Sequence, residues 1–516
     1  MSYFTTMTEA IEQLGPTFSF APFAEILHPL IEEVLAEQEL TKFRKGTLLM
    51  PKVLIWLVLA LTIRRDLNYD KVFNWMMSGF RWLEGLLPPL SKIVSNGTIS
   101  HARVRVGVEL FRLLFTKLTG SFKKIEPDFH GHVSVAFDGT TGTMPDSEAN
   151  QKEYTKPTSG RGQAAFPQLR LVSLLAVSVR LILDVAYGSY AGKGSGERVL
   201  MGQILERLSR EKLLFLLDAG LYAREMAWKI DDRKQAFLVK VPNAVKLKRL
   251  KSLPDGSYLA QLSGKIIDPD NPKREDGRNR WKEVRMIVRI IDYAIPGFRP
   301  ARLMTNILNP DITARALALH YHQRWDIEIT YDEIKTHQCA TLRGQLPTTF
   351  RSKRPDLVAQ ELYAMLIMYN LVRLLIVQAA ASHDKNPRFI SFLDALQHII
   401  DAAPLMTVAD VEQRQAQFNY LMALIADSDI DRPRRHRVNP RVVKVKMSTF
   451  KKKRKTDKSE QRNLAKELEI IGKNPKPSET LVVNPIIPDT TDDFLALTII
   501  ALWIGLATYH VSDIEP

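Results

Sequence analysis

The hydrophobic period of the chain changes near residue 130, and this change limits the folds open to it. Short apolar runs rich in β-branched residues occupy 132–140, 168–179 and 180–188, and the last two meet like the arms of a hairpin. A helical pattern at 197–210 and another apolar strand at 212–220 follow. Strands, a crossover helix and a further strand predict an α/β sheet.

The region before this sheet has the pattern of helices. Thr98 or Ser100 can cap a helix that carries Arg103 and Arg105, and Gly107 is the expected break before a second amphipathic helix. Short helices with a basic turn fit insertion into a DNA groove, although the pattern describes an ordinary helical bundle equally well. The sequence leaves both interpretations open, and we take Arg103 and Arg105 as candidate DNA contacts.

Charge and cysteine content limit the partners and the compartment. The formal net charge is +15, which favours a polyanionic partner, most often nucleic acid, although a basic protein need not bind nucleic acid. Residues 432–456 hold twelve Lys or Arg and no acid, as expected for an extended basic arm. The single cysteine, Cys339, excludes an internal disulfide framework, so we expect a reducing, cytoplasmic compartment.

Two apolar runs raise the question of a membrane. Residues 53–63 span only 11 positions, short of the about 20 needed to cross a bilayer, and read as a buried helix. Residues 494–511 approach that length, but they include two threonines and a histidine and follow Asp492 and Asp493. We expect a packed terminal element there, no membrane partner, and no secretory signal in an N-terminus that lacks a basic start.

Two apolar strands end in an aspartate, Asp138 in VAFDGT and Asp218 in LFLLDAG. An aspartate before glycine or a small residue is common turn chemistry, so each alone is weak evidence for a site. Open α/β sheets, however, place ligands at their strand ends, and Glu328 on a later helix adds a third carboxylate. Three carboxylates suit Mg²⁺ or Mn²⁺, and two such ions can clamp the attacking and leaving oxygens of a phosphodiester.

Glu328 lies in the stretch YHQRWDIEITYDEIKTHQ, residues 321–338. On a regular α-helix, Tyr321, Arg324, Glu328 and Lys335 fall within a stripe roughly 60° wide. A solvated face with an ion pair is the ordinary explanation of such a stripe. If Glu328 faces metal ions, Arg324 and Lys335 can hold neighbouring phosphates and Tyr321 can donate to another. Asp332, one turn further on, is the rival carboxylate.

These four residues match, letter for letter, the motif Y-x2-R-x3-E-x6-K of the DD-E transposases of the IS-four family of bacterial insertion sequences. The chain resembles this family from about residue 45 to about 455, through ISHARVRVG, VAFDGTTGTMPDSEAN, AAFPQLRLVSLL, LLDAGLY, LPDGSYLA, RLMTNILNP and RVVKVKMSTFKKKR. The resemblance implies metal-dependent cut-and-paste transposition, with cleavage at terminal inverted repeats and strand transfer to target DNA.

The resemblance also implies roles for individual residues. Asp138, Asp218 and Glu328 correspond to the metal-binding catalytic triad, which would hold Mg²⁺ or Mn²⁺, with two ions expected. Three more residues correspond to DNA-backbone contacts near the cleaved end: Tyr321, Arg324 and Lys335. In relatives, aromatic residues of the insertion hold a flipped base, and Trp281 is the only tryptophan of this insertion, although a lone tryptophan is more often in the core.

The implied fold class is α/β, with an RNase H-like catalytic core interrupted by a mainly β insertion. We predict five segments: a helical N-terminal DNA-binding domain (1–125), the first part of the core (126–236), the β-rich insertion (237–310), the second part of the core with helices (311–430), and a basic C-terminal region with an apolar tail (431–516). The expected partners are the element's inverted repeats, target DNA and a second copy of the chain in the DNA complex, at the bacterial nucleoid.

Two other functions remain open from the sequence. One is an RNase H-like nuclease or resolvase that cuts DNA without transposing it, and the other is an inactive DNA-binding derivative. The intact triad argues against the derivative, and the helical N-terminal region with the four-residue motif argues against the simple nuclease. The family pattern is lost beyond about residue 457.

Overall fold

The structure is a computed structural model, which describes residues 21–40, 49–76, 94–122, 125–160, 162–192, 194–242, 245, 247–268, 271–296, 298–339, 348–408, 411–430 and 463–471. The basic run 432–456 and the apolar run 494–511 lie outside the described residues. What the sequence predicts for those two runs therefore stays a prediction.

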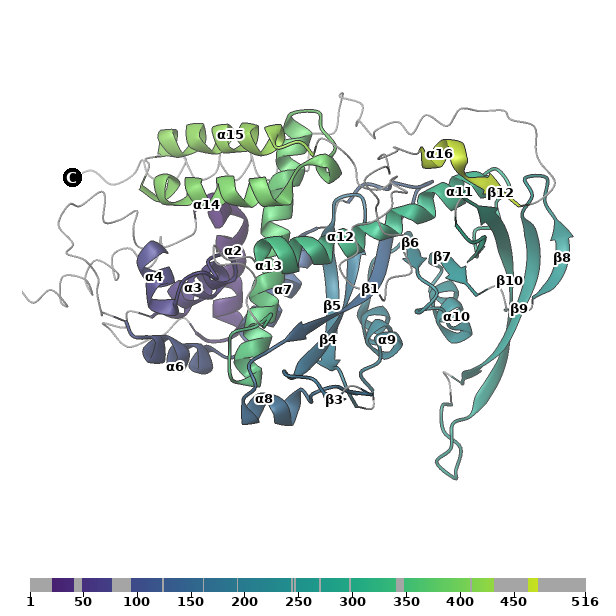
Figure 1. The fold of residues 1–516 in the computed structure, drawn as a ribbon, viewed down its shortest axis with the longest axis horizontal. Helices are drawn as coiled ribbons and strands as arrows, with labels where there is room; N and C mark the ends of the chain where they lie inside the picture. Colours follow the sequence, from purple (N-terminus) through teal and green to yellow (C-terminus); the bar gives the residue numbers. More distant parts are fainter. Residues whose placement is uncertain are drawn as a thin grey trace, which may run out of the picture.

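One mixed sheet organises the molecule (Figure 1). Its strand order is β5-β4-β1-β6-β7-β11-β10-β9-β8, and β12 pairs with the far end of β10. A two-stranded ribbon, β2 and β3, lies apart from it. The strands are β1 (Val133–Thr143), β2 (Thr158–Ser159), β3 (Gly162–Gln163), β4 (Gln168–Ala176), β5 (Leu181–Ser189), β6 (Leu213–Leu217), β7 (Ala236–Val241), β8 (Lys248–Ser252), β9 (Tyr258–Ile267), β10 (Trp281–Ala294), β11 (Ala301–Thr305) and β12 (Glu469–Ile470).

Half of this sheet has the topology of an RNase H-like core. Strand β4 is antiparallel to both β1 and β5, whereas β6 and β7 run parallel to β1. Helix α9 (Glu197–Arg207) makes the crossover from β5 to β6. Every residue of β6 is buried, as expected for a parallel strand covered on both faces. The predicted fold class is confirmed.

The β-rich insertion is continuous with the core sheet. Strand β11 hydrogen-bonds to β7 in antiparallel register, from Arg302 opposite Val241 to Thr305 opposite Leu238. Strands β10, β9 and β8 follow outward from β11. The hairpin of β9 and β10 projects from the body of the molecule in Figure 1. The insertion therefore extends one edge of the core sheet.

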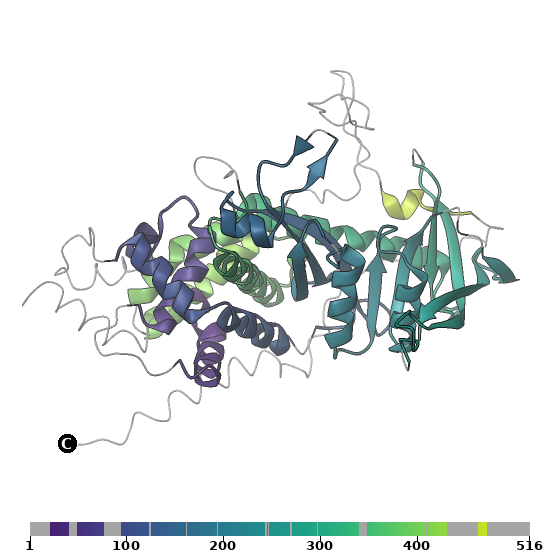
Figure 2. The same ribbon diagram turned by 90° about the horizontal axis from the view of Figure 1, so that it is seen from below.

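Helices from residues 21–122 and 355–427 gather beside the sheet at the β5 end (Figures 1 and 2). The long helix α13 packs against α3, α7, α14 and α15, and α2 packs against α7. The division into five segments stays a prediction. The remaining helices are α2 (Ala24–Glu37), α3 (Pro51–Ile63), α4 (Tyr69–Met76), α6 (Asn96–Val106), α7 (Glu109–Ser121), α8 (Glu148–Glu153), α10 (Arg224–Asp232), α11 (Ala314–Tyr321), α12 (Asp326–Asp332), α13 (Pro355–Ser382), α14 (Phe392–Val408), α15 (Val411–Asp427), α16 (Leu464–Glu467) and short turns η1 (Ala21–Phe23) and η4 (Pro387–Phe389).

Two of these helices are strongly apolar. Helix α3 begins at Pro51, and every later residue of it is buried, which confirms the buried helix predicted for 53–63. Among the described residues, α13 alone is long and apolar enough to cross a membrane, yet 78% of its most apolar window is buried inside the protein. A core helix has this character, so α13 is weak evidence for a membrane span.

Candidate active site

The two predicted aspartates lie at neighbouring strand ends. Asp138 lies in β1 and Asp218 directly follows β6. The parallel register pairs Ala136 with Leu216, so each aspartate lies two residues beyond the same rung of the ladder. The sheet therefore brings Asp138 and Asp218 to one edge.

The carboxylate of each aspartate also accepts a hydrogen bond from the backbone that follows it. One carboxylate oxygen of Asp138 accepts from the backbone N–H of Gly139 at 2.8 Å, and one of Asp218 accepts from that of Leu221 at 2.8 Å. A Cβ atom at position 139 would lie only 2.5 Å from a carboxylate oxygen of Glu197, so a larger residue after Asp138 would have to displace the end of that side chain. An aspartate that stabilises its turn can therefore also serve the site, because these local hydrogen bonds fix the direction of both carboxylates.

The segment that carries Glu328 is not one regular α-helix. After α11 come a 3₁₀ turn, η2 (His322–Trp325), then α12, then a π-helical segment, η3 (Glu333–Gln338). The sequence prediction of a single stripe assumed about 100° per residue throughout and is wrong in that respect, because the hydrogen-bonding period changes three times between Tyr321 and Gln338. A π-helical turn inside a helix is frequent at functional sites.

Two residues of the predicted stripe pair with each other. An Nη atom of Arg324 lies 3.1 Å from a carboxylate oxygen of Glu328, whose side chain is 43% exposed. Burial alone would lower the pKa of Arg324, but Tyr321, Glu328 and Asp138 outweigh it and raise that pKa. The buried Nε of Arg324 has no acceptor among the described residues. The guanidinium is therefore fully charged, and one of its N–H donors lacks an acceptor in the described part of the chain.

The other two stripe residues are placed differently. Tyr321 is buried, and its hydroxyl donates to the backbone carbonyl of Leu217 at 3.0 Å, next to Asp218. In this structure Tyr321 ties α11 to the end of β6. Lys335 is half-buried in the π-helical segment, and burial lowers its pKa.

The charge of the third carboxylate, Glu328, acts on Asp138. The pKa of Asp138 is raised to about 6, first by burial and then by the charges of Asp218 and Glu328, against the opposing effects of the Gly139 N–H and Arg324. Asp138 therefore lies within electrostatic range of both Asp218 and Glu328. Asp332 is exposed, and its carboxylate accepts from the Thr336 hydroxyl at 2.7 Å.

The donors at this site fit a hard divalent cation. All three side chains offer carboxylate oxygens, which Mg²⁺ and Mn²⁺ prefer. Within the described ranges, no three His, Cys, Asp or Glu side chains are already gathered as a ligand set. In this structure Arg324 contacts one carboxylate oxygen of Glu328 at 3.1 Å.

Arg103 is not available for DNA, which corrects its prediction as a DNA-contacting residue. It is 0% exposed. Its guanidinium donates to Gln360 at 3.2 Å, to the Tyr69 hydroxyl at 3.0 Å and to the carbonyl of Leu357 at 3.0 Å. Arg103 instead joins α6 to the start of α13, because a buried guanidinium requires this set of acceptors.

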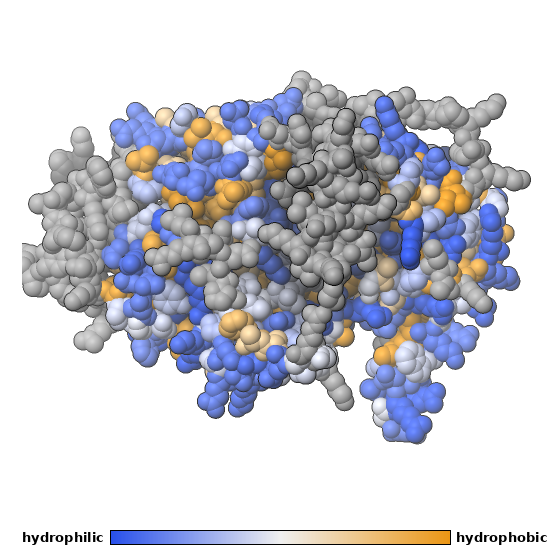
Figure 3. Space-filling model, in the orientation of Figure 1, coloured by the Kyte–Doolittle hydropathy of each residue, from blue (hydrophilic) through white to orange (hydrophobic). Residues whose placement is uncertain are grey.

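Arg105 and Trp281 are accessible. Arg105 is exposed on α6. Trp281, at the start of β10, is 52% exposed, so it is not a core residue. It belongs to the projecting hairpin, whose surface is mostly hydrophilic in Figure 3.

Two residues near the site escaped the sequence analysis. The Tyr331 hydroxyl donates to the backbone carbonyl of Asp138 at 2.7 Å, which anchors α12 to β1. Trp325 is 49% exposed, and the Arg324 guanidinium lies 5.1 Å from the centre of its ring. Trp325 directly follows Arg324 of the motif, so its place near the site could have been predicted from the sequence. The contact of Tyr331 with the backbone of Asp138 follows no sequence pattern.

Two family models and two curated proteins match the chain. Residues 130–371 match the family described as "Transposase DDE domain", and residues 18–116 match "Insertion element 4 transposase N-terminal". The chain is 25% identical over 428 residues to "Transposase InsG for insertion sequence element IS4" of Escherichia coli K12, covering 80% of this chain and 89% of that protein. It is also 25% identical over 138 residues to "Putative transposase InsZ" of the same organism, covering 26% of this chain and 45% of that one.

A solved structure of piggyBac transposase, in a synaptic complex with hairpin DNA, gives a TM-score of 0.38 at 9% identity. The alignment covers 81% of this chain and 86% of that chain. Agreement at this level is too low to establish a shared fold.

Proposed function

Because the chain belongs to the IS4 family of DDE transposases, we propose that Asp138, Asp218 and Glu328 are the catalytic triad of this DNA transposase. A DDE transposase cleaves DNA and transfers phosphoryl groups with the help of divalent metal ions. The observation that carries the assignment is the parallel register of β1 and β6, which brings Asp138 and Asp218 to neighbouring strand ends, and the charges of Asp218 and Glu328 both act to raise the pKa of Asp138.

The triad would hold Mg²⁺ or Mn²⁺, with two ions expected. The ions would supply activation of the attacking water or hydroxyl and stabilisation of the leaving oxygen. The reaction we propose is cut-and-paste transposition, with strand cleavage at terminal inverted repeats followed by strand transfer to target DNA. The chain's own contribution is to hold Asp138 and Asp218 in a fixed direction through Gly139 and Leu221.

Arg324 would couple the binding of DNA to the position of the Glu328 carboxylate. A DNA phosphate that takes the Arg324 guanidinium would satisfy its buried Nε and release Glu328 toward the aspartates. Lys335 would hold a neighbouring phosphate as a point charge. Tyr321, whose hydroxyl is engaged by the Leu217 carbonyl, would position this wall of the site unless DNA binding frees it.

Arg324 and Lys335 should act on phosphates and not on bases. We expect that Arg324→Ala or Lys335→Ala weakens binding to the element's ends and lowers the salt dependence of binding by about one unit of slope each. The preference for end sequences over random duplexes should not change. Binding titrations at several salt concentrations measure both quantities, and a changed sequence preference would point to direct base readout.

Several partners belong to the same proposal. Trp281 is a candidate to stack on a flipped base, which 2-aminopurine fluorescence at the transposon end would report, with Trp281→Ala abolishing the change. Arg105 is a candidate DNA contact on α6. We also propose a homodimer in the complex with DNA, testable by mass measurement with and without end duplexes, and action in the bacterial cytoplasm at the nucleoid.

The experiment for the function is a strand-cleavage and joining assay on DNA that carries the element's own ends. With Mg²⁺ we expect cuts at the boundaries of the inverted repeats and joining of those ends to a second DNA. With EDTA both products should be absent. Cutting without joining would indicate the alternative, an RNase H-like nuclease, and binding without cutting would indicate an inactive derivative.

A further inference from the structure

The helix that carries Glu328 has a second acidic face, which is buried. Asp326 is 0% exposed and Glu333 is 5% exposed. Two residues correspond to about 200° on an α-helix, so Asp326 lies on the side of α12 opposite Glu328. The helix thus presents one carboxylate to the proposed site and buries two others behind it.

Three arginines hold this buried face, and we call them the arginine clamp: Arg180, Arg373 and Arg388. Arg180 donates to Asp326 at 2.8 Å and to Glu333 at 2.9 Å, so it bridges both acids. Arg373 donates to Glu333 through Nε at 3.1 Å and through an Nη atom, and Arg388 donates to Asp326 at 3.1 Å.

The clamp comes from three separate parts of the fold. Arg180 lies in the turn between β4 and β5, Arg373 on α13 and Arg388 in η4. Arg180 has a φ of +56°, a left-handed conformation that is uncommon for a residue with a side chain. Such a conformation persists where the surrounding contacts fix it.

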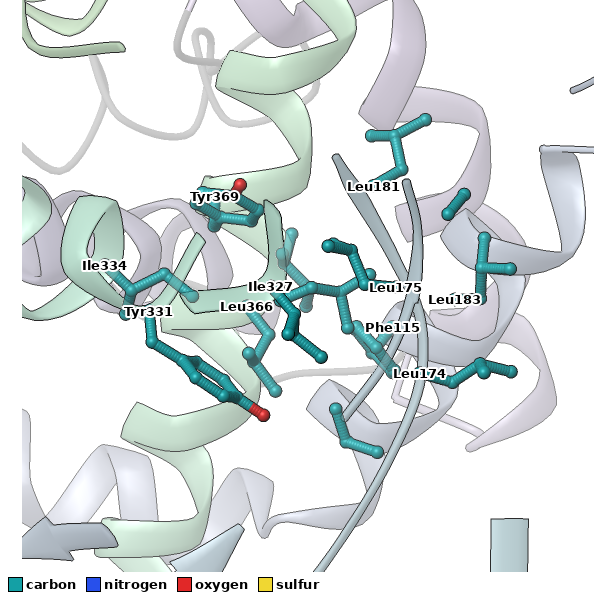
Figure 4. Packing of buried hydrophobic residues seen from close by; sticks show 14 of the residues in the cluster. Phe115, Leu174, Leu175, Leu181, Leu183, Ile327, Tyr331, Ile334, Leu366 and Tyr369 are labelled. Atoms are coloured by element: carbon teal, nitrogen blue, oxygen red, sulfur yellow. The ribbon is translucent and has the colours of Figure 1, made fainter. Parts of the chain in front are cut away.

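Apolar packing already attaches the helix to the protein. Figure 4 shows Ile327, Tyr331 and Ile334 of this segment packed toward Leu366 and Tyr369 of α13. Apolar contacts hold a helix against its neighbours but define its rotation only loosely, whereas charged hydrogen bonds are directional. Buried ion pairs are also costly to desolvate and contribute little net stability, so stability alone is a weak explanation for a clamp of this size.

We propose that the arginine clamp sets the rotation of α12 so that Glu328 faces Asp138 and Asp218. Arg180, which spans Asp326 and Glu333, is its central positioning residue. Glu333 is also the first residue of the π-helical segment, so the arginine clamp contacts the helix at the point where its hydrogen-bonding period changes. The inference rests on the proposed metal site and adds how the protein holds the third ligand in register.

The test compares two equally buried arginines. Arg180 is 3% exposed and Arg103 is 0% exposed, and each makes an ion pair with a buried carboxylate, but Arg103 joins α6 to α13. Arg180→Met and Arg103→Met should therefore lose similar stability in urea unfolding. Only Arg180→Met should weaken Mn²⁺ binding, by about tenfold or more, which is the range for partners that orient metal ligands.

Mn²⁺ binding is measured by electron paramagnetic resonance on the full chain bound to end DNA, without strand cleavage as a readout. Equal Mn²⁺ affinities of Arg180→Met and the wild type, or equal weakening in both variants, would overturn the clamp. Absence of Mn²⁺ binding by the wild type would overturn the metal site and the clamp together. If Arg180→Met is insoluble, Arg180→Lys takes its place, because one ammonium cannot bridge both acids in the same geometry, and unchanged Mn²⁺ affinity would again overturn the proposal.

Discussion

Replacement of Glu328 with Gln should lower strand cleavage by about a thousandfold or more and leave DNA affinity within about twofold. The amide keeps the shape of the side chain but removes the negative charge that would hold a metal ion. A metal ion contributes several kcal/mol to the transition state, and each 1.36 kcal/mol corresponds to about tenfold in rate. The side chain is 43% exposed, so folding should be unaffected. Cleavage rates and binding isotherms on the same end duplex give both values.

Asp332→Asn is the matched control. Asp332 lies one turn from Glu328 and is exposed, with the Thr336 hydroxyl as its partner. We expect near wild-type cleavage from this variant. If Asp332→Asn abolishes cleavage and Glu328→Gln does not, Asp332 is the metal ligand and our assignment is wrong. If Glu328→Gln loses binding as much as cleavage, the carboxylate acts in DNA binding.

Arg103→Ala should cost about 3 to 5 kcal/mol of unfolding free energy, whereas Arg105→Ala should change it by less than about 0.5 kcal/mol. Arg103→Ala would remove the buried cation that lies 3.6 Å from Glu361 and the donor to the side-chain oxygen of Gln360. Arg105 is exposed on the same helix. Urea unfolding of the two variants measures the difference, and equal stabilities would contradict the buried position of Arg103.

The same pair of variants tests sequence recognition. The N-terminal helices pack against α13, so their deletion would also remove one side of the helical bundle. A point change is therefore the cleaner experiment. Arg105→Ala should reduce discrimination between end repeats and scrambled duplexes while stability is kept. Unchanged discrimination would remove Arg105 from the DNA interface.

The aspartates were predictable because their signal is local. An apolar strand that ends in Asp138 or Asp218 marks a strand end, and parallel pairing of such strands brings the ends together. Glu328 was selected from the spacing of a four-residue motif, and its role at the site stays a prediction. The buried α3 was predictable from its continuous apolar run, since a helix that is apolar all round must be enclosed.

Long-range partners were not predictable from the same patterns. Arg103 and Arg105 differ by two positions on one helix, and only the position of α13 makes one buried and the other exposed. The regular helical wheel for 321–338 was wrong because the hydrogen bonding changes to a π-helical period at Glu333. Glu333, which begins that segment, is held by Arg180 from 153 positions away.

The strand that ends the sheet on the insertion side has a further consequence. All five residues of β8 are exposed, and three of them, Lys248, Arg249 and Lys251, are cationic. An open strand edge is a template for aggregation, and positive charges along it repel the same edge of another molecule. Two copies of this chain brought together on DNA should therefore not pair through β8, and the sheet should not continue from one molecule into the other.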